Sequence, residues 1–221
     1  MPEAVDETHR IRAYYREASW RASSGRHFLI AEWRTQVEHV VAELGIDPHS
    51  LRICDVGCGV GSDLQRWHEL GVPERQLSGT ELIPDRAEAA GRALPGASIE
   101  YVDGFHVPFA DGAFDLVTAS LVFSTVVNPA GRRRLATEMR RVTSPGGLIA
   151  IYDFRIRKPW NRNVRPVGDR DLTAVLGPPW RRIAVSPFLP LLDLALRLPS
   201  RMARRLVRVL PRTHRIWMWR V

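Results

Sequence analysis

The alternation of strand-like and helix-like segments between residues 51 and 154 constrains the fold of this chain more than any other feature. Short apolar strands are expected at residues 51–56, 76–80, 98–102, 113–121 and 148–154. Helices are expected between them at residues 62–70, 84–94 and 129–142. Strands that alternate with helices at short spacing form parallel sheets covered by helices on both faces. The sequence therefore predicts an α/β protein with a doubly wound, mostly parallel sheet.

The flanking segments extend this prediction. Two more strands, which bring the sheet to seven, are expected at residues 181–188 and 213–221. Helices are expected at residues 6–23, 28–44 and 191–210. The first two predict a helical cap over residues 1–45, because that segment is too short to bury a core of its own. The main domain is then expected at residues 46–221, with a helical insertion at residues 189–212 before the last strand.

Length and composition exclude several protein classes. The 221 residues suit one domain, and 45% hydrophobic with 25% charged residues is ordinary globular composition. No uncharged apolar run reaches the roughly 18 residues that a membrane span needs. The first residues carry neither a basic nor an apolar signal region. The two cysteines, Cys54 and Cys58, lie too close together to form a secreted disulfide framework, so a cytoplasmic location is expected.

Charge is distributed very unevenly along the chain. Residues 132–221 carry 21 basic and 5 acidic side chains, whereas residues 1–131 carry 11 basic and 19 acidic ones. Lys158 is the only lysine, so a coding bias toward arginine is one explanation for the basic composition. A coding bias does not explain the uneven distribution, which favours contact between the second part of the chain and an anionic partner. Both explanations stay open.

A glycine-rich turn, Asp-Val-Gly-Cys-Gly-Val-Gly at residues 55–61, follows the first expected strand. Glycine at such a turn lets a ligand approach the backbone closely. The dinucleotide fingerprint would require its third glycine where this chain has Ser62. Asp55 disfavours a pyrophosphate and favours an ammonium group. Glu81, 22 residues after Gly59, ends the second strand and can accept both ribose hydroxyls. S-adenosylmethionine carries such a ribose and a cationic group without a pyrophosphate.

Five segments in the same order resemble the motifs of class I S-adenosylmethionine-dependent methyltransferases. They lie at residues 55–61, 79–82, 102–109, 113–117 and 141–148. Together they resemble the ubiquinone-biosynthesis-like, methyltransferase-domain branch of that family. The resemblance covers roughly residues 50–155. It implies a Rossmann-like fold for the whole chain and S-adenosyl-L-methionine as the cofactor.

The resemblance also implies which residues hold the methionyl end of this cofactor. They are Asp55 and the backbone of Gly57, Cys58 and Gly59 in the glycine-rich turn. Ser120, at the end of the fourth strand, would lie near the methionyl carboxylate.

A second group of residues is assigned to the adenosine end by the same resemblance. Glu81 would bind the ribose diol, and Leu82 would stack on adenine. Asp103 would accept a hydrogen bond from the adenine amino group, while the backbone of Gly104 would meet the ring.

Two side chains are candidate general bases. His106 lies just beyond the segment expected to meet adenine, and Asp153 lies near the end of the fifth strand, where α/β active sites gather. Each has a plain structural alternative. His106 also fits an exposed loop, and Asp153 also fits an ion pair with Arg155 or Arg157.

Several other cysteine and aromatic residues are better explained by packing than by a catalytic or metal-binding role. Cys54 and Cys58, with three residues between them and no second pair, have poor spacing for zinc, so no metal site is expected. Trp33 lies among apolar residues at helical spacing and is expected in the core. Tyr14 and Tyr15 are expected either to pack or to close over the cofactor.

The sequence favours methylation of a small-molecule acceptor over two alternatives. The preferred acceptor group is a hydroxyl on a biosynthetic intermediate such as a sugar, polyketide or lipid-linked compound, and catalysis would depend on positioning. The basic half keeps an RNA methyltransferase open, and the absence of an obvious base keeps a non-catalytic cofactor-binding protein open. The Pro-Pro-aromatic segment at residues 178–180 does not follow the fourth strand, where amino-directed nucleic-acid methyltransferases carry it, and this counts against the RNA alternative. No DNA partner is expected. The sequence does not identify the methyl acceptor or the oligomeric state.

The expected insertion at residues 189–212 is amphipathic in its second half. The apolar face is expected to contain Met202, Leu206, Val209 and Leu210. The opposite face is expected to contain Arg201, Arg204, Arg205 and Arg208. One interpretation is a helix docked on the sheet with its arginines in solvent. The other is a basic face that contacts an anionic acceptor, or a lipid-linked one at a membrane surface.

Overall fold

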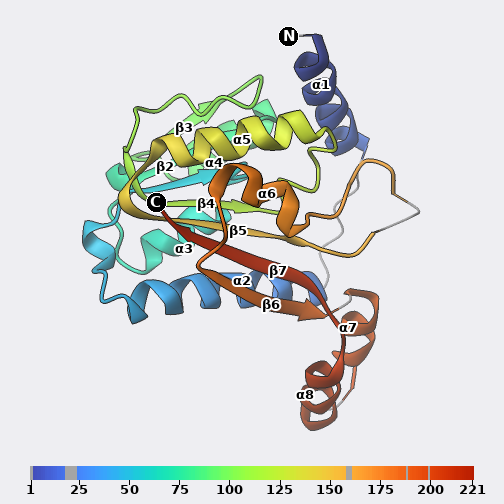
Figure 1. Cartoon of the computed structure of the whole chain (residues 1–221). Helices are drawn as coiled ribbons and strands as arrows, with labels where there is room; N and C mark the ends of the chain where they lie inside the picture. Colours follow the sequence, from blue (N-terminus) through green and yellow to red (C-terminus); the bar gives the residue numbers. More distant parts are fainter. Residues whose placement is uncertain (1, 18–23, 158–160, 188, 199) are drawn as a thin grey trace.

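The computed structural model describes residues 2–17, 24–157, 161–187, 189–198 and 200–221. Seven strands form one sheet in the order β3-β2-β1-β4-β5-β7-β6 (Figure 1). Their bounds are β1 (Ile53–Val56), β2 (Leu77–Glu81), β3 (Ser98–Tyr101), β4 (Phe114–Ser120), β5 (Thr143–Phe154), β6 (Arg181–Pro187) and β7 (Arg212–Arg220). Neighbouring strands are parallel except for β7, which runs antiparallel to both β5 and β6. The predicted seven-stranded, mostly parallel sheet is therefore confirmed.

Eight α-helices are present in the described residues, and α2 to α6 cover the two faces of the sheet (Figure 1). Their bounds are α1 (Pro2–Glu17), α2 (Ser24–Glu43), α3 (Ser62–Glu69), α4 (Pro84–Ala93), α5 (Pro129–Val142), α6 (Asp169–Leu176), α7 (Leu189–Ala195) and α8 (Ser200–Val209). Helices α5 and α6 pack on one face, and α2, α3 and α4 pack on the other. The sheet is thus buried between two layers of helices.

Alternate residues of β5 and β7 supply the two halves of the core. Ile149 and Ile151 of β5 face α5 and α6, while Ala150 and Tyr152 face α2 and its neighbours. This alternation follows from the two-residue period of a strand, which sends successive side chains to opposite faces. Trp33 of α2 is 2% exposed and its ring stacks on that of Tyr152 at 5.4 Å, which confirms the core position predicted for it.

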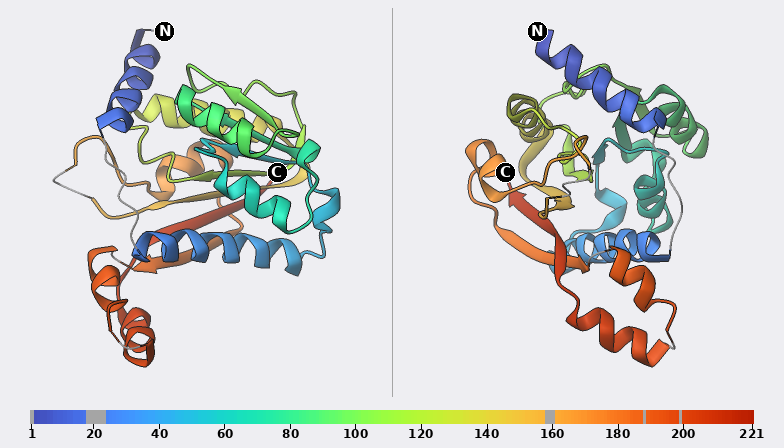
Figure 2. Two further views of the ribbon diagram at one scale, coloured as in Figure 1. Left: turned by 180° about the vertical axis from the view of Figure 1, so that it is seen from behind. Right: turned by 90° about the vertical axis from the view of Figure 1, so that its right-hand side faces the viewer.

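Three segments gather at the edge of the sheet where the parallel strands end. Helix α1, the connection after β5 and the pair α7–α8 all lie at this carboxyl edge, which faces the viewer in the right panel of Figure 2. Parallel α/β sheets bind ligands outside this edge. The fold therefore places three non-sheet segments around the position where a ligand is expected.

Some boundaries differ from the prediction. Strand β5 begins at Thr143, earlier than expected, because Thr143 pairs with Phe114 of β4. The end of the chain also pairs with residues expected in a turn: Gly146 N–H donates to Val221 O, and Val221 N–H donates to Gly147 O. The helical segment expected at residues 191–210 contains two helices, α7 and α8, and residue 199 between them lies outside the described residues. Residues 18–23 of the first expected helix also lie outside them.

Membrane-spanning helices are not found in the part of the chain that the structure describes. None of its helices combines the length and the apolar character that crossing a bilayer requires.

Candidate active site

A cavity of about 570 Å³ lies at the carboxyl edge of the sheet. The glycine-rich turn after β1 and the ends of β2 and β4 form one wall. Helices α1 and α2 and the start of β7 contribute the others. The cavity therefore joins segments that are far apart in the sequence, and the residues predicted for the site can be located against it.

The glycine-rich turn is shaped by backbone conformations that favour glycine. Gly57, Gly59 and Gly61 have φ angles of +72°, +59° and +80°. A Cβ atom on Gly57 would lie only 2.6 Å from Cγ2 of Val122, so the loop after β4 fills the space that a side chain would need. The bare backbone at Gly57 is therefore required by packing as well as by conformation.

Glu81 connects the end of β2 to this turn. Its Oε2 accepts a hydrogen bond from Gly59 N–H at 2.8 Å, and its Oε1 accepts from Leu82 N–H and Ile83 N–H at 2.9 Å each. The side chain is buried but lines the cavity. Each carboxylate oxygen has two lone pairs, so Oε1 is fully used and Oε2 keeps one lone pair that can accept from a hydroxyl of a ligand diol.

Asp55 is a buried carboxyl group at the base of the cavity, 3% exposed. Burial raises its pKa well above the ordinary range, and nearby Asp63 and Glu81 raise that pKa further. A hydrogen bond from Thr118 Oγ1 at 2.7 Å and the positive charge of Arg34 act in the opposite direction. A cationic ligand group would favour the ionised form of Asp55, so the position suits an ammonium group.

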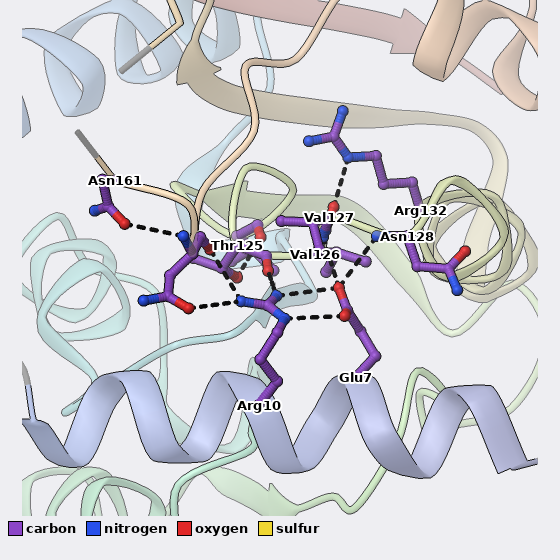
Figure 3. Close-up of polar contacts among 10 residues, drawn as sticks. Glu7, Arg10, Thr125, Val126, Val127, Asn128, Arg132 and Asn161 are labelled. Carbon is purple, nitrogen blue, oxygen red and sulfur yellow. Dashed lines mark hydrogen bonds and ion pairs between the residues drawn. The ribbon is translucent and has the colours of Figure 1, made fainter. Parts of the chain in front are cut away.

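Helix α1 is attached to the loop after β4 by two charged side chains (Figure 3). Oε1 of Glu7 accepts from the backbone N–H groups of Val127 and Asn128 at 2.6 and 3.2 Å. Arg10 donates to both Glu7 oxygens, at 3.0 and 3.1 Å, and also to the backbone oxygen of Thr125. Glu7 is 7% exposed, so these charge-assisted bonds are largely shielded from water.

The inner side of α1 presents apolar and aromatic residues to the cavity. Ile11, Tyr14 and Tyr15 all line it, and Tyr15 also packs against the core, so closure of the tyrosines over a ligand stays a prediction. The guanidinium of Arg86 lies over the Tyr15 ring, 4.4 Å from its centroid. Burial raises the pKa of Tyr15, so this phenol stays neutral. The hydroxyl of Tyr14 accepts a hydrogen bond from Asn161 Nδ2 at 3.2 Å.

The end of β4 carries an unusual backbone conformation. Ser120 lines the cavity at the position predicted for it, and the next residue, Leu121, has a φ angle of +58°. A non-glycine residue in this left-handed region is uncommon and costs free energy. Leu121 N–H donates to Tyr152 O at 2.8 Å and holds the turn in place. Leu121 was not predicted from the sequence.

His214 is a second cavity residue that the sequence analysis missed. Antiparallel pairing of β7 with β5 places it opposite Phe154, at the carboxyl edge. It is 6% exposed, its ring stacks on Tyr152 at 5.3 Å, and its Nδ1 lies 3.0 Å from the hydroxyl oxygen of Thr213. The location of His214 follows from the antiparallel direction of β7. A parallel final strand would place its first residues at the opposite edge of the sheet, away from the cavity.

Asp153 does not occupy the position expected of a general base. It is fully buried and does not line the cavity. Its two oxygens accept from the backbone N–H groups of Ser124 and Phe154, at 2.8 Å each, rather than pairing with Arg155 or Arg157. Burial raises its pKa to about 6. We therefore assign Asp153 to holding the loop after β4, in place of proton transfer.

The remaining predicted residues divide between the cavity and its rim. Leu82 and Gly104 line the cavity. Asp103 is exposed and is not among the lining residues, although both of its neighbours are. His106 lines the cavity from the rim with a 72% exposed side chain, and its Nδ1 lies 2.7 Å from Oε2 of Glu138.

Cys54 and Cys58 are buried free thiols. Cys58 lines the cavity and packs against Gly79, where a Cβ atom would lie 2.8 Å from its Sγ. No cluster of three or more metal-binding side chains occurs among the described residues. The cysteines therefore act in packing around the turn.

The sheet order, the glycine-rich turn and the acid at the end of β2 define a Rossmann-like domain that binds a nucleoside-containing ligand. Residues 54–151 match a family model described as a methyltransferase domain. This part of the chain belongs to the class I S-adenosylmethionine-dependent methyltransferase family. The narrower ubiquinone-biosynthesis-like branch stays a prediction.

Two sequence relatives illustrate the extent of the match. The methyltransferase GfsG of Streptomyces halstedii is 32% identical over 110 residues, which is 48% of this chain and 38% of that protein. An uncharacterized methyltransferase of Mycobacterium tuberculosis is 37% identical over 106 residues, 47% of this chain and 39% of that protein. The matched part thus spans about two fifths of each of these relatives.

Solved structures share the fold across most of the chain. Geranyl diphosphate C-methyltransferase from Streptomyces coelicolor A3(2) has a TM-score of 0.67 at 15% identity and covers 97% of this chain and 98% of its own. That structure contains Mg²⁺, geranyl diphosphate and S-adenosyl-L-homocysteine. The [4+2]-cyclase SpnF has a TM-score of 0.60 at 18% identity and covers 85% of this chain and 80% of its own. At these identities the likeness shows the fold alone.

Proposed function

We propose that this protein transfers the methyl group of S-adenosyl-L-methionine to a hydroxyl group of a small-molecule acceptor. The observation that carries the proposal is one continuous cavity that Asp55 and Glu81 line together with His214. The first two residues suit the cofactor, and His214 is a group that can receive a proton. The acceptor is a biosynthetic intermediate, such as a sugar, polyketide or lipid-linked compound.

The cofactor occupies the part of the cavity beside the glycine-rich turn in this proposal. Glu81 accepts hydrogen bonds from the ribose diol, and Asp55 faces the methionyl ammonium group. Leu82 and Gly104 form the adenine wall, and Ser120 lies near the methionyl carboxylate. The cavity positions of these residues support the assignment. Asp103 then contacts the adenine amino group only if its exposed side chain turns inward.

The acceptor occupies the part of the cavity lined by α1, the end of β5 and the start of β7. Tyr14, Phe154, Val164 and His214 contribute to this lining and make it largely apolar and aromatic. Such a lining favours an acceptor with an apolar body and few polar groups. Asn161, which donates to Tyr14, supplies one fixed polar contact.

The chemistry is an in-line displacement. The acceptor hydroxyl oxygen forms a bond to the methyl carbon, while the bond from that carbon to sulfur breaks and its electron pair stays on sulfur. S-adenosylhomocysteine leaves, and the hydroxyl proton passes to a base. His214 is the proposed base because it is buried in the cavity wall, whereas the exposed ring of His106 is engaged with Glu138. Positioning of the two reactants supplies most of the rate enhancement.

The cap proposed for residues 1–45 then divides into two parts. Helix α2 packs into the core through Trp33, so it belongs to the scaffold. Helix α1 reaches over the cavity and is fastened by Glu7 and Arg10, which suits a lid that excludes water during transfer. Only α1 therefore acts as the cap in this proposal.

The two alternative functions, an RNA methyltransferase and a non-catalytic cofactor-binding protein, differ in how well the structure supports them. Part of the basic half of the chain serves the structure: Arg132 is 1% exposed and pairs with Asp171 at 3.1 Å, and Arg182 and Arg215 pair with Asp169. Burial removes Arg132 from contact with RNA, and Asp169 offsets part of the charge of Arg182 and Arg215, which disfavours an RNA methyltransferase. Because a [4+2]-cyclase shares the fold, the fold by itself does not distinguish a methyltransferase from a cofactor-binding protein that performs no methyl transfer, which stays the second candidate.

Calorimetry tests the cofactor assignment first. We expect heat of binding for S-adenosylmethionine and S-adenosylhomocysteine, and none for NAD. Tight NAD binding with no S-adenosylmethionine heat overturns the proposal. Transfer is then followed by mass spectrometry, with isotope-labelled cofactor and a panel of hydroxylated acceptors.

His214→Ala is expected to lower kcat for an identified acceptor while leaving cofactor affinity unchanged. His106→Ala is the matched control, because that histidine lies at the rim. Cofactor binding without transfer to any acceptor class would favour the non-catalytic candidate.

A further inference from the structure

Helix α8 exposes a row of apolar side chains. Met202, Leu206 and Val209 are 56%, 37% and 76% exposed. Their spacing of four and three residues places them along one line of the helix surface. Large side chains exposed in such a continuous row mark an interaction surface more often than scattered ones do.

The docked side of α8 lies next to this row. Ala203 and Val207 are buried and pack in one cluster with Leu29 of α2 and with Leu192 and Ala195 of α7. Ala203 and Val207 directly follow Met202 and Leu206 in the sequence, so the buried row and the exposed apolar row are adjacent on the surface of α8. The apolar face of α8 is thus wider than the body of the protein covers. This corrects the prediction that Met202, Leu206 and Val209 form the docked face.

Arginines border the exposed apolar row. Arg201, Arg205 and Arg208 are exposed, and each directly precedes one of the three apolar residues. Arg197 is exposed as well, while the side chain of Arg204 lies outside the described part of the structure. Asp193 is the only acidic residue between positions 189 and 212. The surface of α8 that faces solvent therefore combines apolar groups with positive charge.

Helix α7 and its C-terminal extension expose further apolar side chains. Leu191, Leu194 and Leu198 are 42%, 58% and 37% exposed. The α7–α8 pair projects from the carboxyl edge of the sheet, the edge at which the cavity lies (Figures 1 and 2). Leu29 connects the two features, because it packs against this pair and also lines the cavity.

We propose that α8 binds the surface of an anionic phospholipid bilayer. Met202, Leu206 and Val209 enter the boundary between headgroups and acyl chains, and the arginines bind lipid phosphates beside them. A helix with this division of apolar and basic faces lies in the plane of a membrane interface. Arginine suits phosphate because its guanidinium forms two parallel hydrogen bonds. A bilayer satisfies both the apolar row and the positive charge, whereas a free anion leaves the apolar row in water.

The location adds a consequence that rests on the proposed methyltransferase function. A bilayer bound at α8 would lie on the same edge of the protein as the cavity mouth. The acceptor class favoured by this placement is a lipid-linked or otherwise membrane-partitioned hydroxyl compound. Vesicle binding itself requires no methyl transfer, so failure of one proposal is distinguishable from failure of the other.

Sedimentation of the full chain with vesicles tests the proposal. One set of vesicles contains phosphatidylcholine alone, and the other contains phosphatidylcholine with about one third phosphatidylglycerol. We expect binding to the anionic vesicles that weakens as salt increases, and little binding to the neutral ones.

Two triple variants separate the apolar and the charged contributions. Met202→Ser/Leu206→Ser/Val209→Ser removes the exposed apolar row without touching the docked residues. Arg201→Gln/Arg205→Gln/Arg208→Gln removes three charges and is expected to lower partitioning about 100-fold. The matched control is Arg133→Gln/Arg134→Gln/Arg170→Gln, which removes three charges from exposed arginines of α5 and α6. It is expected to bind nearly as well as the parent protein.

A probe on the apolar row reports insertion directly. Leu206→Cys can be labelled with an environment-sensitive dye, because Cys54 and Cys58 are buried. We expect a blue shift of the dye on anionic vesicles. The same label at His39→Cys, on an exposed position of α2, is expected to show none.

Three results would overturn the proposal. The first is that the parent protein does not sediment with anionic vesicles. The second is equal loss in the control triple variant, which would indicate unspecific attraction by net charge. The third is a dimer in solution that the apolar variant converts to a monomer with no change in vesicle binding, because the row would then be an interface between copies of this chain.

Discussion

The carboxylate of Glu81 and the backbone N–H of Gly59 lie 2.8 Å apart and form a hydrogen bond that braces the glycine-rich turn against the end of β2. The same carboxylate accepts from Leu82 and Ile83. The buried Glu81 side chain thus holds the glycine-rich turn when no ligand is bound and, in the proposed function, also accepts from the ribose diol. Its replacement should affect stability and ligand binding together.

Glu81→Ala is expected to weaken cofactor binding by about 1.5–3 kcal/mol for each lost charge-assisted hydrogen bond. The free energy of unfolding of the empty protein should also fall, because three backbone N–H groups lose their acceptor. Calorimetry and chemical denaturation measure the two effects. Glu88→Ala is the control, since that side chain is exposed and pairs only with Arg92 among its described contacts. Unchanged affinity in Glu81→Ala would place the ribose elsewhere.

Gly57→Ala should destabilise the protein more than Gly59→Ala. Both substitutions impose a left-handed backbone on an alanine, at about 1–2 kcal/mol. Only Gly57 also brings its new Cβ within 2.6 Å of Val122, whereas nothing lies within 4 Å of the position at Gly59. The difference in unfolding free energy should shrink when Val122→Ala is added to Gly57→Ala. If the two glycine variants unfold alike, packing against Val122 does not constrain the turn.

Asp55→Asn is expected to stabilise the empty protein at neutral pH and to weaken cofactor binding. Burial raises the pKa of Asp55, so the folded state keeps its proton to higher pH than the unfolded chain does. The stability of the parent protein should therefore fall as pH rises above the ordinary value of 3.8, and the variant should lack this contribution. Thermal unfolding across pH measures the difference. Calorimetry of the parent in buffers with different ionisation enthalpies should detect proton release on cofactor binding. Identical pH profiles for the two proteins would contradict the prediction.

Arg10→Ala should detach α1 with little effect on global folding. The substitution removes the arginine's bonds to Glu7 and Thr125, which we expect to lower the docking free energy of α1 by about 1–3 kcal/mol. Faster hydrogen exchange in α1 and faster release of S-adenosylhomocysteine are the expected signs. Arg16→Ala removes an exposed arginine of the same helix and should change neither. Normal retention of the product in Arg10→Ala would show that α1 is no lid.

The central sheet and the turn were predictable because their signals are local. The spacing from Asp55 to Gly61 and the acid at the end of β2 identify a ligand site without any long-range information. The structure places Asp55, Glu81, Leu82, Gly104 and Ser120 around one cavity, as the sequence indicated. Parallel strands make this possible, because the ends that carry these residues must meet at one edge of the sheet.

The errors concern features that depend on packing. For Asp153 the sequence left a base and an ion pair with Arg155 or Arg157 open. Strand period and pairing turn the side chain into the protein, where it accepts from the backbone N–H groups of Ser124 and Phe154 instead. His214 was not predicted as a site residue, because its location depends on the direction of the last strand. The docked row of α8 was misplaced by one residue along the chain, because a wide apolar face does not reveal which part of it the protein covers.

A cavity ligand that displaces Leu29 would link the cavity thermodynamically to the α7–α8 pair. The Leu29 side chain lines the cavity and packs against Leu192, Ala195 and Val207, so a ligand that moves it alters the free energy of packing of both helices. Such a coupling is reciprocal. Whatever binds on the helices must change affinity in the cavity by the same factor by which a cavity ligand changes affinity on the helices. Through Leu29 of α2, binding in the cavity and binding on α7 and α8 would then change each other's affinity.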